Sequence, residues 1–146
     1  GIAKGYAVDK VAAYLEAAFN IDAYLVDIGG EVKARGKNAK GKTWTATIYI
    51  PPAYSSIKSP KVVLLNTSIA TSGVYFKQDH IKNPGTEDAV SNDLLSSSVI
   101  HPSNAQADAL ATALYVMGSE KGWHWVRENN VQAIFIKNDG TVLDSR

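Results

Sequence analysis

Two oxygen-bearing side chains, Asp108 and Thr112, stand four residues apart in the alanine-rich segment NAQADALATALYVMG, residues 104–118. In a helix this spacing places both side chains on one face. One interpretation is the solvent-exposed face of an amphipathic helix, and the spacing alone favours it. The other is a site for a hard divalent cation such as Mg²⁺, which takes carboxylate, hydroxyl and carbonyl oxygens and keeps some of its water. Asp108 and Thr112 are therefore the first candidate metal ligands.

Three further polar residues stand where a ligand could bind. Lys4 lies in the segment GIAKG, which we expect to be a loop leading into a helix, where free amides and a lysine suit an anion. His80 opens a long polar loop, residues 80–92, and a histidine can act as a general base near neutral pH. Asp27 precedes a glycine pair and could accept hydrogen bonds from the turn or contact a ligand. For Lys4 and His80, the alternative is a solvated surface side chain.

The hydrophobic pattern predicts the elements that must position these candidates. A helical period favours three helices, at residues 6–19, 104–118 and 120–129. The second is expected to be capped by Ser103 or Asn104 and to end at Gly118. Short apolar runs favour strands at residues 23–28, 44–50, 61–66, 68–76 and 96–100, followed by a hairpin at 132–145.

Some expectations are more detailed. The first helix should bury the stripe Val8, Val11, Ala12, Leu15 and Phe19. The polar, glycine-punctuated segment 33–43 is expected to be a connection, and a turn at Ser72-Gly73 should interrupt the strand at 68–76. In the run 44–50, alternation predicts one buried face, formed by Trp44, Ala46, Ile48 and Ile50.

Length and composition limit the possibilities. The chain has 146 residues, which we expect to form a single α+β domain, residues 1–146, with a largely antiparallel sheet packed against helices. The net charge of +1 offers no electrostatic surface for nucleic acid. With no cysteine, the chain has no disulfide and no thiolate metal site. There is also no glycine-rich phosphate loop of the Rossmann or Walker type.

Five motifs, taken in order, carry a resemblance: GIAKGYAVDK, LVDIGGEVKARG, IATSGVYF, HIKNP and ADALATALYVMG. In sequence and spacing they resemble the ApbE family of FAD:protein FMN transferases, from Gly1 to about Gly140. Members of this family are about twice as long. The resemblance therefore implies that this chain is a C-terminal half, and that a missing N-terminal half supplies much of the flavin-binding surface. It also favours a periplasmic protein or a membrane-anchored lipoprotein, with a cytoplasmic location as the alternative.

The resemblance implies a reaction and its site. FAD is the substrate, Mg²⁺ lies at its pyrophosphate, and a threonine or serine hydroxyl of a target redox protein, for example a quinone-reductase-type subunit, receives FMN while AMP leaves. The implied metal ligands are the carbonyl of Gly1 and the side chains of Asp108 and Thr112. Ala111 stands where some members carry an acidic residue.

The same resemblance implies roles for residues around the flavin. Lys4 and Lys82 match flavin-contacting positions, and Asp27 is grouped with them as a cofactor-binding residue. His80 matches the histidine of the family's loop and is the implied base that removes the hydroxyl proton. Asn83 replaces the family's aspartate in that loop, and an asparagine cannot accept a proton as a carboxylate can.

Three functional hypotheses follow. The leading one is the magnesium-dependent flavin transferase. In the second, water takes the place of the acceptor hydroxyl at the same site, which makes the protein an FAD pyrophosphatase. In the third, the chain is a flavin-binding module without catalysis, because Asn83 and its neighbours differ from the family's loop. A purely structural domain would leave the ordered motifs unexplained.

Overall fold

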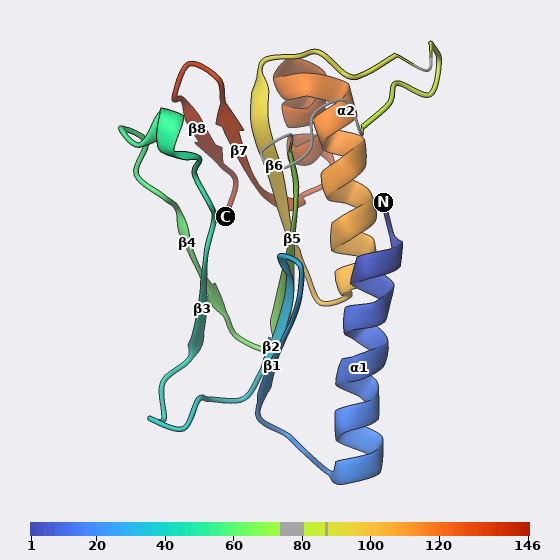
Figure 1. The fold of residues 1–146 in the computed structure, drawn as a ribbon, viewed down its shortest axis with the longest axis vertical. Helices are drawn as coiled ribbons and strands as arrows, with labels where there is room; N and C mark the ends of the chain where they lie inside the picture. The colour runs from blue at the N-terminus through green and yellow to red at the C-terminus, as the bar shows by residue number, and fades with distance from the viewer. Residues whose placement is uncertain (74–80, 87) are drawn as a thin grey trace.

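The computed structural model describes residues 1–73, 81–86 and 88–146, which are arranged in three layers (Figure 1). Within these residues the middle layer is a six-stranded antiparallel sheet in the order β1-β2-β5-β6-β7-β8. Its strands are β1 (Tyr24–Ile28), β2 (Glu31–Arg35), β5 (Thr67–Gly73), β6 (Leu94–His101), β7 (Gln132–Lys137) and β8 (Val142–Asp144). On one side lie the helices α1 (Ala3–Phe19) and α2 (Asn104–Glu128), and on the other lies a ribbon of β3 (Trp44–Thr47) and β4 (Lys61–Leu64). The predicted α+β fold with an antiparallel sheet is confirmed.

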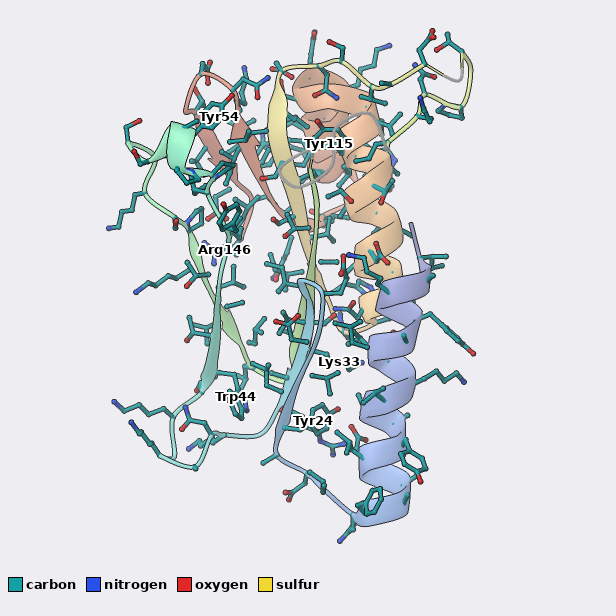
Figure 2. All side chains as sticks on the ribbon, in the orientation of Figure 1. Tyr24, Lys33, Trp44, Tyr54, Tyr115 and Arg146 are labelled. Carbon is teal, nitrogen blue, oxygen red and sulfur yellow. The ribbon has the colours of Figure 1, made fainter. Side chains whose placement is uncertain are left out.

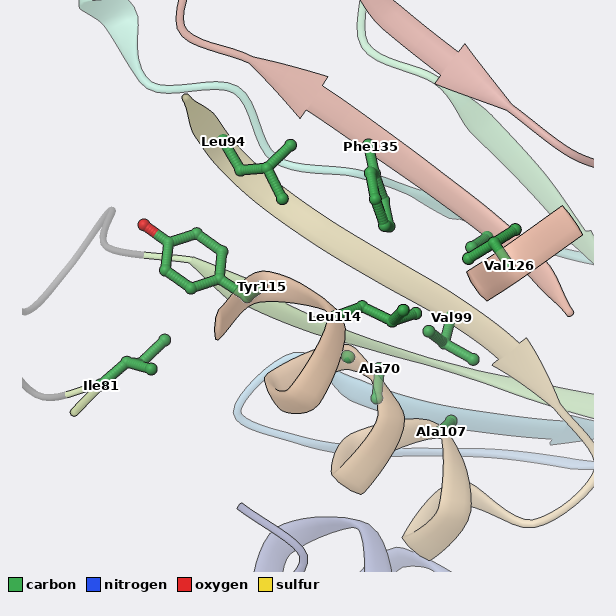
Figure 3. Packing of buried hydrophobic residues seen from close by; sticks show 11 residues of the cluster. Ala70, Ile81, Leu94, Val99, Ala107, Leu114, Tyr115, Val126 and Phe135 are labelled. Carbon is green, nitrogen blue, oxygen red and sulfur yellow. The ribbon is translucent and has the colours of Figure 1, made fainter. Parts of the chain in front are cut away.

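Strands β6 and β7 bury side chains on both faces because both faces of the sheet are covered. On the helical face, Ala107 and Leu114 of α2 pack against Val99 of β6 and Phe135 of β7 (Figure 3). On the opposite face, side chains of the β3–β4 ribbon and the segment after β3 pack against the sheet; this second cluster includes Ile48, Val62, Leu64, Ile69, Ile134 and Ile136. The sheet is thus fixed from both sides.

Helix α1 begins at Ala3, earlier than expected, and packs through a narrow stripe. Val8 and Ala12 are buried against Tyr24 and Val26 of β1. The prediction that Val11 and Phe19 share this stripe is wrong, because Val11 is 42% and Phe19 61% exposed. The helix contacts its neighbours along one narrow line of small residues, so side chains to either side of that line face outward.

Helix α2 is kinked at Gly118, where φ is 77° and ψ is 176°. This left-handed φ suits glycine, and the predicted end of one helix and start of another at this point is confirmed. Two adjacent side chains support the kink: Asn92 donates to the carbonyl of Tyr115, and Asp93 accepts from the amide and hydroxyl of Ser119. Among the described residues, no helix is long and apolar enough to cross a membrane.

Two expectations about strands are wrong. Residues 33–35 belong to β2 and not to a connection, because Lys33 and Ala34 pair with both β1 and β5. Ser72 and Gly73 form no turn; they are the last residues of β5 and pair with β6. The alternation predicted for residues 44–50 is confirmed, with the even-numbered side chains more buried than the odd-numbered ones.

Candidate functional site

A cleft with a volume of about 720 Å³ lies between the N-terminal part of α1, the β1–β2 hairpin, the end of β5, β3 and α2. Six of the seven site residues predicted from the sequence line it: Gly1, Lys4, Asp27, Lys82, Asp108 and Thr112. The seventh, His80, lies outside the described residues. Residues up to 111 positions apart in sequence therefore meet in one cavity.

Asp108 is buried at this cleft, with 4% of its surface exposed. Its Oδ2 accepts a hydrogen bond of 3.0 Å from the amide of Gly5, a free donor in the first turn of α1. Ala111 and Tyr115 follow Asp108 by three and seven residues and so share its helix face. The interpretation of this face as solvent-exposed is wrong, because Ala111 is fully buried and Tyr115 is 2% exposed. Helix α1 and the sheet cover the face that spacing alone would give to water.

Oδ1 of Asp108 and the hydroxyl of Thr112 both lie beside Gly1. The nitrogen of Gly1 is 3.7 Å from Asp108 Oδ1 and 2.5 Å from Thr112 Oγ1. The Thr112 hydroxyl also lies 2.9 Å from that of Ser72, at the end of β5. A carboxylate oxygen and two hydroxyls that lie close together form a donor set that suits a hard metal ion.

Lys4 lies in the first turn of α1 and not in a loop as expected, and its ammonium is already paired. Its Nζ is 2.5 Å from Oε2 of Glu31 and 3.3 Å from the carbonyl of Gly29. Glu31 is 2% exposed, whereas the side chain of Lys4 is 54% exposed. Burial raises the pKa of Glu31 above its usual value, the Lys4 ammonium opposes that rise, and the charge of Asp108 adds to it.

Glu31 is the site residue that sequence reasoning missed. It is the first residue of β2, directly after the glycine pair, and that turn places it in the cleft. Its partner Lys4 is 27 positions away, so no local spacing points to the pair. The signal in the sequence was the motif LVDIGGEVKARG, which contains Glu31.

Asp27 and Lys82 both line the cleft, and each has a different local role. Asp27 Oδ1 accepts a 2.9 Å hydrogen bond from the amide of Gly30, so its carboxylate supports the hairpin turn while lining the cleft. The backbones of Lys82 and Ala89 pair in an isolated antiparallel β-bridge. Next to this bridge, the side-chain oxygen of Asn83 accepts a hydrogen bond of 2.9 Å from the amide of Gly85.

The rest of the lining is mixed. Hydroxyl groups come from Thr71 and Ser72 of β5 and from Thr45 and Thr47 of β3, while apolar surface comes from Leu25, Val32, Ile48 and Ile69. A largely apolar cavity with a few directed polar groups is the usual form of a small-molecule site. This lining suits a ligand with both a flat apolar part and a charged part.

A metal ion here would depend on few protein charges. Within residues 1–73, 81–86 and 88–146, no three His, Asp or Glu side chains form a cluster that could hold a metal by themselves. Mg²⁺ nevertheless fits, because it commonly takes one or two carboxylates and completes its octahedron with water and substrate phosphates. The observation that supports this fit is that the buried carboxylate of Asp108 lies in the cleft together with the hydroxyls of Thr112 and Ser72.

Comparisons with known proteins match nearly the whole of this chain to one family. The model of the ApbE family matches residues 1–135. The FAD:protein FMN transferase of Haemophilus influenzae is 36% identical over 144 residues, which cover 92% of this chain and 41% of that protein. The corresponding protein of Vibrio cholerae is 37% identical over 143 residues, covering 92% of this chain and 42% of that protein.

Solved structures show the same likeness. The flavin transferase ApbE from Vibrio cholerae aligns with a TM-score of 0.84 at 35% identity, over 98% of this chain and 48% of that one. The apo form of the Pseudomonas stutzeri flavinyl transferase ApbE aligns with a TM-score of 0.86 at 32% identity, over 98% of this chain and 47% of that one. The chain spans less than half the length of these relatives, and it belongs to the ApbE family.

Proposed function

We propose that this chain carries the metal- and flavin-binding part of a magnesium-dependent FAD:protein FMN transferase. The acceptor would be a threonine or serine hydroxyl of a target redox protein, and AMP would be released. The names of the relatives support the reaction, and the cleft supports the site. The observation that carries the proposal is that the three proposed ligand residues, Gly1, Asp108 and Thr112, lie side by side in the cleft.

The proposed reaction exchanges one phosphorus–oxygen bond for another. The acceptor hydroxyl oxygen bonds to the FMN-side phosphorus of FAD, and the bond from that phosphorus to the bridging oxygen breaks. The bridging oxygen leaves as part of AMP, and FMN stays on the acceptor as a phosphoester. His80 is proposed to take up the proton of the hydroxyl, a role for which histidine is suited near neutral pH.

The chain's own residues would bind and orient the pyrophosphate. We propose that Asp108, Thr112 and the carbonyl of Gly1 hold Mg²⁺, which when bound offsets negative charge on the pyrophosphate and on the leaving AMP. Lys4 is placed to donate to an anionic ligand, because Glu31 fixes its ammonium while about half of the side chain stays exposed. Lys82 and Asp27 would contact the flavin nucleotide from the cleft wall.

The test uses chromatography to measure how much AMP the full-length protein releases from FAD. It is run with and without Mg²⁺, and with and without a peptide that carries an acceptor threonine. Mg²⁺-dependent AMP together with an FMN-labelled peptide would support the transferase. AMP without labelled peptide would favour hydrolysis of FAD, and bound FAD without AMP would favour a binding module.

A further inference from the structure

Helices α1 and α2 cap each other's N-termini. Asp108 of α2 accepts from the amide of Gly5, in the first turn of α1. In return, Asp9 of α1 accepts from two amides in the first turn of α2, those of Asn104 at 3.1 Å and Ala105 at 3.0 Å. Because these amides have no partner within their own helix, each carboxylate satisfies donors that the other helix leaves free.

Asp9 is also fixed from the sheet. Its Oδ1 lies 2.6 Å from Nζ of Lys33 on β2, which points toward α1 (Figure 2), and both side chains are about four-fifths buried. Lys33 donates as well to the carbonyl of Pro102, and the hydroxyl of Ser103, the N-cap of α2, donates to Asp9 at 2.9 Å. One carboxylate therefore joins α1, β2 and the start of α2.

The two helices approach closely at this crossing. A Cβ on Gly5 would lie 2.4 Å from the carbonyl oxygen of Asn104 and 2.8 Å from Cβ of Asp108. The proposed ligands come from both sides of the crossing, because Gly1 lies just before α1 whereas Asp108 and Thr112 both lie on α2. A change in the register of α1 against α2 would therefore move Gly1, with its carbonyl, relative to the two side chains of α2.

We infer that Asp9 is a positioning residue for the cation site: it sets the register of the two helices and thereby the spacing of the ligands that they carry. Asp9 is not among the residues that line the cleft, so it acts through the helices and not by contact with a ligand. This inference rests on the proposed function, since it assumes that Asp108 and Thr112 bind a cation.

The test measures cation binding without FAD and without turnover. Mn²⁺ is titrated into the full-length protein and free Mn²⁺ is read by electron paramagnetic resonance. Asp9→Asn keeps the size of the side chain but removes the charge that holds the amides and Lys33. We expect Mn²⁺ affinity to fall about tenfold, at the low end of the effect of outer residues on metal sites.

Asp93→Asn is the matched control. Asp93 also accepts from a helix amide, a serine hydroxyl and a lysine, namely Ser119 and Lys137, but it supports the kink in α2 and does not join the two helices. We expect this variant to keep wild-type Mn²⁺ affinity within about twofold. Equal losses in both variants would mean that Asp9 only stabilises the fold, and would overturn the inference.

Two further arms separate the possible failures. If Asp108→Asn weakens Mn²⁺ binding but folded Asp9→Asn does not, the inference fails and the proposed site stands. If Asp108→Asn leaves binding unchanged, the proposed metal site fails and the inference with it. Should Asp9→Asn not fold, Lys33→Gln replaces it, with an expected loss of about threefold, and unchanged affinity in that folded variant would overturn the inference.

Discussion

Substitutions of Asp108 can separate its charge from its hydrogen bond. Asp108→Asn keeps an oxygen that can accept from the Gly5 amide, but it removes the charge and turns an amide group toward the cation position. Asp108→Ala removes both the charge and the acceptor. In the structure these two functions belong to different oxygens, since Oδ2 accepts from Gly5 and Oδ1 lies on the side of Gly1.

The magnitudes follow from electrostatics and burial. A unit charge about 4 Å from a divalent ion is worth about 2 kcal/mol even in bulk water, twice the value for two unit charges. Either variant should therefore need at least about 30-fold more Mg²⁺ for half-maximal AMP release, because each 1.4 kcal/mol is a factor of ten. Asp108→Ala should in addition lose about 2 kcal/mol of stability, because the buried Gly5 amide is left without a partner. For a chain of this size that loss lowers the Tm by about 4–8 °C.

The assay pairs a Mg²⁺ titration of AMP release with thermal unfolding of both variants in the absence of metal. A wild-type Mg²⁺ dependence in Asp108→Asn would mean that Asp108 does not bind the cation. Equal unfolding temperatures of Asp108→Ala and Asp108→Asn would mean that the hydrogen bond to Gly5 does not stabilise the fold. The two results are independent, so one can fail while the other holds.

Gly5→Ala should lower the Tm markedly, because its methyl group would meet the Asn104 carbonyl at 2.4 Å, and overpacking of this kind costs about 1–3 kcal/mol; unchanged thermal unfolding would contradict this. The hydrogen bond from the Ser119 hydroxyl lowers the pKa of Asp93 from 3.8 to about 2; burial opposes this shift, and Lys137 adds to it. Protonation of Asp93 should thus remove stability as the pH falls from 3.8 to about 2, and Asp93→Asn should flatten that part of a plot of Tm against pH. His80→Ala should slow FMN transfer by about 10²–10⁴ without changing Mn²⁺ affinity, and a wild-type rate in a transfer assay would exclude His80 as the base.

Much of the fold follows from local patterns in the sequence. Period-two alternation identified the buried face of residues 44–50, and Gly118 ended a helical pattern where its left-handed φ breaks the helix. The errors share a cause, which is that neighbours override local signals. The polar residues 33–35 read as a connection, yet they form a strand because β1 and β5 pair on both sides of it.

The site was predicted less completely than the fold, and the reason is distance along the chain. Spacing alone favoured solvent for Asp108, because a helical wheel does not show that α1 lies over that face. Lys4 appeared free because its partner Glu31 comes from a hairpin that local sequence does not connect to it. The ordered motifs indicated which residues gather, while the partners of each charge became visible only in the folded chain.

Asp108 serves both the helix crossing and the proposed cation site. The two oxygens of Asp108 divide these tasks, since Oδ2 accepts from the Gly5 amide and Oδ1 lies on the side of Gly1. The helix crossing that allows the Gly5 amide to reach Oδ2 also brings Gly1 beside Oδ1 and the Thr112 hydroxyl. A change that relaxes the crossing should therefore weaken cation binding even where it leaves every ligand in the sequence.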